Sequence, residues 1–416
     1  MTWLVRITFA VLVAATVAAF FVTQRLKRSP AIVFAAHWGP KAFSPDGDHV
    51  HDRAFLRFRL RKSDDVTVSV VNDDGDIVRT LTSSRSVAAR TPVLLSWNGR
   101  DADGRRAPDA YYRARIGLRH QGRVVVSPGV VKLDTKAPHP IVEAVQGRST
   151  TAAKTPLFVT AGKVQPVNVR FRGSPTRHTQ LLVERTDVSP ARVVARAFAR
   201  AQVHTIHWDG LVHGGPPPTG VYRLRVSLSD LAGNVGLSAR RAPGIGLTVR
   251  AVAVQPPLTP TRAGTRGTVY VDARRHRYHW ALREIGAGRV LERGAGRSSR
   301  LHVRPPVGDA RLDVLTVTAN GQSTAVPFLV GSPAHRHILV VLPALRWLGQ
   351  DAVDDDGDGL PNTLDRGEPV PLYRVLGALP DGVRTQEGRL LAYLDSRVDR
   401  YEVTTDAALA LGQGPS

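Results

Sequence analysis

The chain has 416 residues, and its 57 basic and 35 acidic side chains leave a formal net charge of +22. Hydrophobic residues make up 42% of it, enough for several packed cores, which excludes a compositionally disordered protein. The absence of cysteine excludes disulfides, thiolate metal sites and cysteine nucleophiles.

Residues 1–30 predict a membrane anchor. Residues 7–22 read ITFAVLVAATVAAFFV, and with Leu4, Val5 and Thr23 the run approaches the ~20 residues that a membrane helix needs. Charged residues follow at once, and no small-x-small cleavage site precedes them, which favours a retained signal anchor over a cleaved leader.

The orientation of this anchor has two interpretations. Three basic residues follow the run and one precedes it, so a strict positive-inside count places the body of the chain in the cytoplasm. Large β-sandwich arrays behind a leader are typically exported, which favours the opposite orientation. We expect a single-pass protein of the cell membrane with the bulk of the chain extracytoplasmic.

A repeated motif predicts β-sandwich modules. Residues 94–118 read LLSWNGRDADGRRAPDAYYRARIGL, and residues 205–228 read TIHWDGLVHGGPPPTGVYRLRVSL. The matched positions are Trp97 with Trp208, Gly99 with Gly210, and Tyr112 with Tyr222. A spacing of about a hundred residues fits tandem immunoglobulin-like (Ig-like) sandwiches, in which we interpret the tryptophans as core anchors.

The expected fold class is therefore mainly β. We place the first Ig-like sandwich at 31–137, the second at 138–250 and a third, small sandwich at 251–331. The third is expected from short strands at close spacing with glycine and proline between them. The segment Asp230–Leu–Ala–Gly–Asn near the end of the second sandwich predicts a tight turn.

Five segments of the first module occur in a distinctive order. They are FSPDGD at 43–48, VTVSVV at 66–71, DDGDIVRTL at 73–81, WNGRDADGR at 97–105 and the strand that begins at Tyr111. In this order they resemble the Ig-like domain of the flagellar hook-capping protein family. Ala110 departs from the glycine usual in that family, which the second copy keeps as Gly220. The resemblance implies a scaffold module without implying a flagellum.

From His337 the pattern changes. HILVVLPAL at 337–345 is a continuous apolar run, typical of a strand buried on both faces of a parallel sheet. Residues 388–398 are helical in pattern, and residues 400–412 predict a second strand leading to a helix. Two strands cannot form a doubly wound domain, so 332–416 is expected to be an incomplete α/β segment, either a fragment or docked on the third sandwich.

The same segment carries a second resemblance. Residues 338–364 and 390–409 resemble the start of a domain in subunits related to the N,N-dimethylformamidase large subunit. The resemblance implies a glutamine-amidotransferase-like fold, whose activity would use a cysteine nucleophile that this chain lacks. Neither a GxSxG context nor a phosphate loop is present, so we expect no enzyme.

An acidic loop has the oxygen-ligand spacing of a calcium site. The candidate ligands are Asp354, Asp356, Asp358, the Leu360 carbonyl, Asn362 and Asp365. The loop resembles the DxDxDG calcium loops of extracellular bacterial proteins, and its alternative is a solvated acidic loop. A weaker calcium candidate comprises Asp46, Asp48 and Asp52, whose alternative is a turn that caps the strand at 54–60.

Together these features favour a membrane-anchored, exported scaffold or binding protein of the bacterial cell envelope. The alternative is a non-catalytic front part or subunit of an amidohydrolase-like assembly with an α/β partner subunit. Other expected partners are a cell-envelope protein or an anionic wall polymer. Nucleic acid is disfavoured, because the arginines alternate along strands and neither an arginine-aromatic ladder nor a zinc-finger spacing is present.

Overall fold

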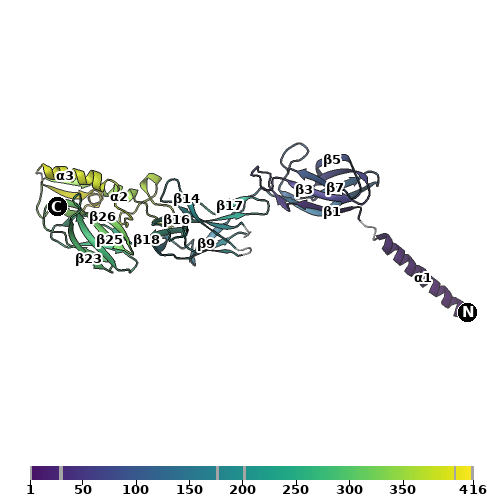
Figure 1. Ribbon diagram of the computed structural model, residues 1–416, viewed down its shortest axis with the longest axis horizontal. Coiled ribbons are helices and arrows are strands. Elements are labelled where there is room, and N and C mark those ends of the chain that lie inside the picture. Colours follow the sequence, from purple (N-terminus) through teal and green to yellow (C-terminus); the bar gives the residue numbers. More distant parts are fainter. Residues whose placement is uncertain (1, 28–30, 175–177, 200–202, 398–399, 414–416) are drawn as a thin grey trace. The chain divides into compact units, whose positions relative to one another are not determined.

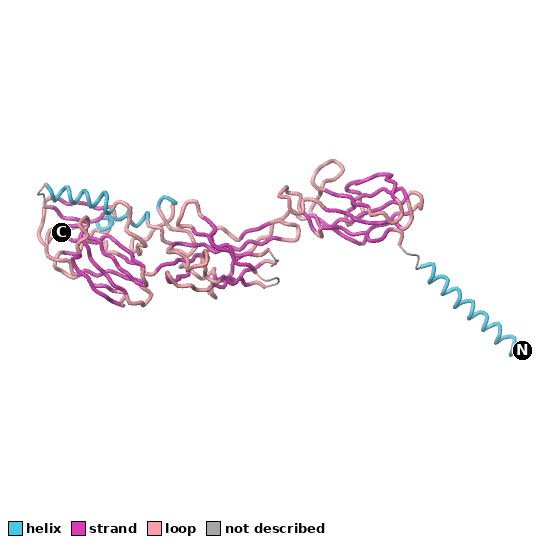
Figure 2. Tube along the Cα trace, in the orientation of Figure 1, coloured by secondary structure: helices cyan, strands magenta, loops and turns pink. Residues whose placement is uncertain are grey.

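The computed structural model describes residues 2–27, 31–174, 178–199, 203–397 and 400–413 (Figure 1). Strands dominate, and helices occur at the N-terminus and after the last sandwich (Figure 2). The chain divides into two compact units, Met1–Ala137 with Asp230–Asn234, and Pro138–Ser229 with Val235–Ser416. The helices are α1 (Thr2–Lys27), α2 (Ala344–Gln350), α3 (Gly388–Ser396) and α4 (Asp406–Ala410), with short helical turns at Leu364–Arg366 and Val383–Glu387.

Helix α1 carries the expected membrane segment. Its residues Val5–Thr23 are long and apolar enough to cross a membrane by length and composition, and none is buried against the rest of the chain. A signal sequence would pass the same test. The hydroxyls of Thr16 and Thr23 donate to the carbonyls of Leu12 (2.8 Å) and Ala19 (2.6 Å), so both polar groups are satisfied within the helix.

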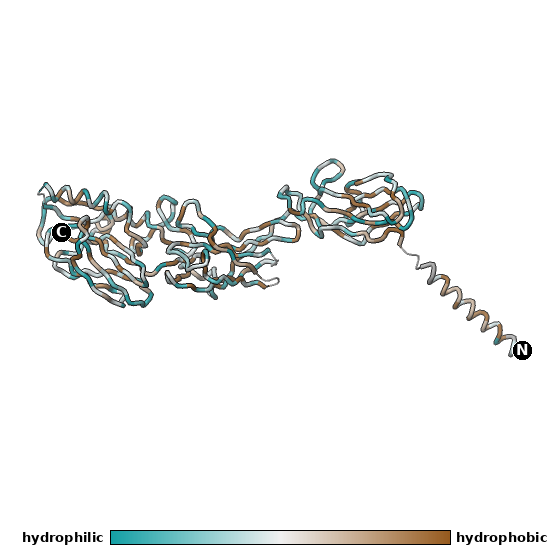
Figure 3. Tube along the Cα trace, viewed as in Figure 1, coloured by the Kyte–Doolittle hydropathy of each residue, from teal (hydrophilic) through white to brown (hydrophobic). Residues whose placement is uncertain are grey.

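The first sandwich pairs a three-stranded sheet, β1-β3-β6, with a five-stranded sheet, β2-β8-β7-β4-β5. Along β3 the burial alternates, with Leu56 and Phe58 inside and Phe55 and Arg57 outside, which is the period of a half-buried strand. Hydrophobic and hydrophilic segments are interleaved along the chain (Figure 3). The strands are β1 (Val33–Gly39), β2 (Ala42–Phe43), β3 (Ala54–Leu60), β4 (Asp64–Val71), β5 (Ile77–Val87), β6 (Val93–Trp97), β7 (Ala110–Leu118) and β8 (Arg123–Leu133).

The second sandwich repeats this strand order. Its sheets are β9-β12-β15, extended by β10, and β11-β18-β16-β13-β14, with β17 paired to β16. The strands are β9 (Ile141–Val145), β10 (Arg148–Ser149), β11 (Leu157–Thr160), β12 (Val167–Arg172), β13 (Gln180–Arg185), β14 (Arg192–Phe198), β15 (Thr205–Trp208), β16 (Gly220–Ser229), β17 (Val235–Leu237) and β18 (Gly246–Arg250).

The third sandwich has the same order again, β19-β21-β24 against β20-β26-β25-β22-β23. In all three, a short strand (β2, β11 or β20) pairs in parallel with the strand of the larger sheet that comes last in the sequence (β8, β18 or β26). The strands are β19 (Ala253–Gln255), β20 (Thr261–Arg262), β21 (Gly267–Asp272), β22 (Tyr278–Glu284), β23 (Val290–Gly296), β24 (Arg300–Val303), β25 (Arg311–Ala319) and β26 (Gln322–Gly331). The predicted fold class, with three tandem Ig-like sandwiches, is confirmed.

The tryptophans of the repeated motif lie in the cores of the first two sandwiches, as predicted. Trp97 is 1% exposed and Trp208 is 2% exposed. The indole N–H of each donates to a carbonyl three residues later, that of Arg100 at 2.9 Å and that of Leu211 at 3.1 Å. Each ring therefore fills the core and fixes the turn that follows its strand.

The tyrosines of the motif have an equally regular role. The hydroxyls of Tyr112 and Tyr222 donate to the carbonyls of Pro108 and Pro218, each four residues earlier and each at 2.6 Å. Both tyrosines are buried. The phenol thus satisfies its own polar atom while it ties the loop before the strand to the core.

In the third sandwich an ion pair takes the place of this tyrosine. Asp313 is the third residue of β25, as Tyr112 is of β7, and it is fully buried. Nε of Arg311 donates to its carboxylate at 3.0 Å, and Arg311 also donates to the carbonyl of Pro306 at 3.2 Å. Burial raises the pKa of Asp313 from 3.8 to about 6, despite the arginine.

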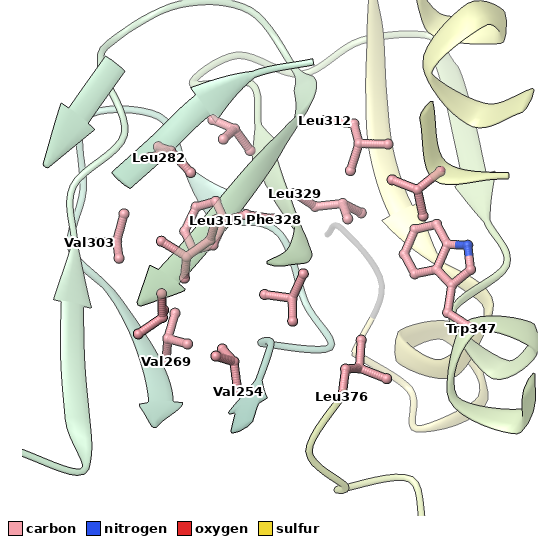
Figure 4. Close-up of a cluster of buried hydrophobic side chains, with 14 of the residues drawn as sticks. Val254, Val269, Leu282, Val303, Leu312, Leu315, Phe328, Leu329, Trp347 and Leu376 are labelled. Carbon is pink, nitrogen blue, oxygen red and sulfur yellow. The ribbon is translucent and has the colours of Figure 1, made fainter. Parts of the chain in front are cut away.

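The residues after β26 share the core of the third sandwich. Trp347 of α2 and Leu376 lie beside Leu312 and Leu329 of the larger sheet (Figure 4). Strands β27 (Ile338–Leu342) and β28 (Tyr401–Thr405) form a parallel pair. The segment 332–416 therefore packs on the third sandwich.

The expectation that the first strand of this segment is buried on both faces is wrong. Ile338, Leu339 and Val341 are 42%, 43% and 44% exposed. Within the described part of the chain β27 pairs only with β28, so its other edge and much of its surface have no covering element.

The predicted turn at Asp230–Asn234 is present. Oδ1 of Asp230 accepts from the backbone N–H of Ala232 at 2.9 Å and of Asn234 at 3.0 Å. Nδ2 of Asn234 donates to the carbonyl of Asp134 at 2.9 Å. The bond from Asn234 to Asp134 links the turn to the first compact unit, to which it belongs although its sequence flanks belong to the second.

Candidate functional site

The acidic loop after α2 brings three of the predicted calcium ligands together. One carboxylate oxygen from each of Asp354, Asp356 and Asp358 lies within 4.8 Å of the others. Asp354 is buried at 2% exposure, whereas Asp356 is exposed and Asp358 is half-buried. The group is therefore accessible from one side and packed on the other.

The three remaining predicted ligands lie further along the loop. The backbone N–H of Leu360 donates to Oδ1 of Asp358 at 2.7 Å. Oδ1 of Asn362 accepts the N–H of Asp355 at 2.7 Å, so this amide closes the base of the loop. Asp365 lies in the short helical turn Leu364–Arg366, and its side chain is exposed.

Electrostatics in the loop disfavour three free carboxylates. Burial, together with the neighbouring Asp358 and Asp356, raises the pKa of Asp354 to about 7, although the N–H groups of Gly357 (2.6 Å) and Gly359 (2.9 Å) donate to it. Burial and Asp356 also raise the pKa of Asp358. A divalent cation would offset this cost, because it favours the ionised form of every carboxylate that it contacts.

The loop is held against the second sandwich by contacts remote in sequence. The N–H of Gly246 donates to the carbonyl of Gly357 at 2.8 Å, and the hydroxyl of Thr186 donates to the carbonyl of Gly359 at 2.6 Å. Gly246 is required there, since a Cβ at this position would overlap Oδ2 of Asp354. The loop is thus the seam between the second sandwich and the C-terminal segment.

Arg374 holds the loop through buried contacts with its backbone and with Asp355, a role that the spacing of the predicted ligands does not reveal. Its guanidinium donates to the carbonyls of Leu348 (2.8 Å), Asn362 (3.0 Å) and Val353 (3.0 Å), and it contacts Oδ2 of Asp355 at 3.0 Å. The side chain is 1% exposed. Only its place in the otherwise apolar run PLYRVL could have drawn attention to it.

The weaker candidate, in the first sandwich, is a more exposed loop. Asp46, Asp48 and Asp52 also place one oxygen each within 4.8 Å of the others. Asp52 accepts the N–H groups of Gly47 (2.8 Å) and His49 (3.0 Å), which is the arrangement expected for a turn before β3. Asp46 and Asp48 are exposed, so this loop lacks the buried carboxylate of the other.

Comparisons with known proteins add only a likeness of fold. No protein-family model matches the chain, and no curated protein matches it. Among solved structures, the human OSCAR ligand-binding domain is 14% identical with a TM-score of 0.27, and the match covers 49% of this chain and 95% of that one. An ICAM-5 D1–D4 ectodomain fragment is 12% identical with a TM-score of 0.22, covering 82% and 90%.

Dimeric latent PorU from Porphyromonas gingivalis is 10% identical with a TM-score of 0.17, and the match covers 71% of this chain. The chain spans 32% of the length of PorU. The Ig-like assignment rests on the strand order of the three sandwiches.

Proposed function

We propose that this chain is a membrane-anchored scaffold or binding protein of the bacterial cell envelope, with its three Ig-like sandwiches outside the cytoplasm. The observation that supports it most is α1, an apolar helix without one buried residue in Val5–Thr23, ahead of three modules with one strand order. An apolar surface of that length needs a hydrophobic environment, and the other described residues do not cover it. Modules in series then present loops and sheet edges to a partner.

Labelling of intact cells tests this proposal cleanly, because the chain contains no cysteine. Ser83 is exposed in the first sandwich. We expect a Ser83→Cys variant to react with a membrane-impermeant maleimide to the same extent in intact and in lysed cells. The parent chain, which has no cysteine, gives the background labelling. Labelling that requires lysis would place the sandwiches in the cytoplasm, in line with the strict positive-inside count, and would contradict the proposal.

The scaffold is further proposed to bind calcium at the loop of Asp354, Asp356 and Asp358. Three observations support this assignment. The carboxylate oxygens of the three residues are clustered, the buried carboxylate of Asp354 has a raised pKa, and Gly359 permits the sharp turn of the loop. The ion would bind from the exposed side, where Asp356 lies. Because the loop joins the second sandwich to the C-terminal segment, bound calcium would strengthen that seam.

Calcium titration of the full chain in detergent, with thermal melts, tests the site. We expect saturable heat and a higher melting temperature, since a ligand at 100 times its Kd adds about 2.7 kcal/mol to stability. Asp356→Asn with Asp358→Asn should abolish both effects. Asp73→Asn with Asp74→Asn, in an exposed hairpin turn, is the control with the same charge change. Heat that survives in the loop variant, or is absent from the parent, would reject the site.

A second candidate function is the front part of an amidohydrolase-like assembly. One edge of β27 is exposed and apolar and has no strand paired to it among the described residues, which supports this candidate, since an edge of this kind is a template for an added strand. An α/β partner subunit would extend the parallel pair β27-β28. Slow hydrogen exchange along both strands in the purified chain would favour the scaffold, whereas protection that appears only with such a subunit would favour the assembly.

A further inference from the structure

A pocket of about 650 Å³ in the third sandwich gathers three arginines. Two segments line it: residues 270–275, which comprise the end of β21 and the turn after it, and residues 297–299, which lead into β24. Arg274 and Arg275 come from the first segment, and Arg297 comes from the second. Tyr270, which is 48% exposed, contributes an aromatic wall.

Both segments are fixed by hydrogen bonds to ordered parts of the module. The N–H of Val271 donates to the carbonyl of Ser299 at 2.8 Å. The hydroxyl of Tyr278, a core residue with 1% exposure, donates to the carbonyl of Ser298 at 2.8 Å. The N–H of Arg274 donates to Oδ1 of Asp272 at 3.1 Å. The pocket is therefore preorganised.

The turn holds two arginines in a backbone conformation that favours glycine. Arg274 has a φ of 51° and Arg275 a φ of 63°. A residue with a Cβ is strained in this conformation, whereas glycine is not. Two such residues in succession define the turn that carries two of the pocket arginines.

These arginines lack the acidic partners that neutralise others in the same unit. Arg223 is paired with Glu184, and Arg311 with Asp313. The carboxylate in the pocket, Asp272, is bound by Arg250 at 3.0 Å. Within the described ranges, no carboxylate lies within 4.0 Å of the guanidinium of the three pocket arginines.

Arg274 is also oriented by an aromatic ring. Its guanidinium carbon lies 5.1 Å from the centre of the Phe158 ring, and that of Arg250 lies 4.4 Å from the same ring. A guanidinium packed on a ring keeps its N–H donors directed along its edges. Its hydrogen-bonding capacity therefore remains available to a ligand.

We propose that this pocket binds phosphate groups of an anionic polymer at the cell surface. Guanidinium forks match the paired oxygens of phosphate, and three of them can neutralise adjacent groups on one strand. The volume exceeds that of a single phosphate, so neighbouring units of the polymer fit along Tyr270. The assignment goes beyond the proposed scaffold function and rests on it only for the location of the polymer.

Binding of soluble inorganic polyphosphate to the full chain in detergent tests the pocket. This probe carries phosphate groups without sugar or base. We expect Arg275→Ala with Arg297→Ala to weaken binding at least tenfold. Arg119→Ala with Arg266→Ala is the matched control, because it removes the same charge from exposed positions outside the pocket. Its affinity should change less than threefold.

A charge-preserving variant separates geometry from charge. Arg275→Lys with Arg297→Lys keeps both cations but loses the forks, and it should bind several-fold more weakly than the parent. Unchanged thermal melts would show that these exposed substitutions leave the module folded. Equal losses of polyphosphate affinity in the pocket and control variants would show that binding depends on net charge alone and would overturn the proposal. The absence of polyphosphate binding by the parent chain at low salt would overturn it as well.

Binding of single-stranded DNA tests whether the pocket prefers the phosphates of a cell-surface polymer or those of a nucleic acid. We expect the DNA to bind more weakly than polyphosphate, because sugars space its phosphate groups further apart than in polyphosphate. Tighter, pocket-dependent binding of DNA would assign the pocket to nucleic acid and overturn the surface-polymer proposal. The labelling of Ser83→Cys is independent of all these results, so failure here and failure of the scaffold proposal are distinguishable.

Discussion

Replacement of Trp97 by alanine is expected to destabilise the first sandwich by about 3–5 kcal/mol, a large share of the stability of one such module. The indole is 1% exposed and packs edge-on against Phe43 and Tyr112, with ring centres 5.4 Å and 4.7 Å away. Alanine would leave a cavity between these rings. It would also release the carbonyl of Arg100, which the indole N–H now satisfies.

Hydrogen exchange of the full chain, followed by peptide, checks this prediction without relying on tryptophan fluorescence. We expect protection to fall across 31–137 and to be unchanged across 235–397. Leu94→Ala on the same strand is the control, because Leu94 is 61% exposed and its loss should cost less than ~0.5 kcal/mol. Similar exchange in Trp97→Ala and Leu94→Ala would show that the indole does not anchor the core.

The repeated motif could be recognised in the sequence because the same side chains make the same contacts in the first and second sandwiches. A tryptophan and a tyrosine whose polar atoms bind nearby carbonyls leave a fixed spacing in the sequence. The third sandwich keeps the strand order but not the residues. Val303 pairs with Gly267 as Trp97 pairs with Ala54, and the Arg311–Asp313 pair replaces the tyrosine. Topology is therefore conserved where no motif signals it.

In the acidic loop, too, some features could be predicted from the sequence and others could not. Its ligand spacing is local, so Asp354, Asp356 and Asp358 could be found by counting residues. The partners that position it, Thr186 and Gly246, are more than a hundred residues away, and their roles depend on the packing of two modules. The exposure of β27 was missed for the same reason, since an apolar run does not reveal how many strands will cover it.

Replacement of Arg374 by methionine is expected to cost about 3–5 kcal/mol and to loosen the acidic loop. Methionine keeps much of the side-chain volume but leaves three carbonyls and the carboxylate of Asp355 without their buried cation. Arg374→Lys should recover only part of the lost stability, because a single ammonium group cannot reproduce a planar guanidinium that donates to all three carbonyls. Arg389→Met, at an exposed position of α3, is the matched control and should have little effect.

Limited proteolysis and peptide hydrogen exchange of the full chain provide the measurement for Arg374. We expect cleavage and faster exchange to appear first at 351–376 in Arg374→Met, while the first sandwich keeps the protection of the parent. Because the loop joins the second sandwich to the C-terminal segment, exchange at Thr186 and Gly246 should also rise. If the loop of Arg374→Met resists protease as well as that of Arg389→Met, the loop is held by its contacts with the second sandwich alone. In that case the buried guanidinium would contribute little to the seam, since its desolvation would cancel what its hydrogen bonds contribute.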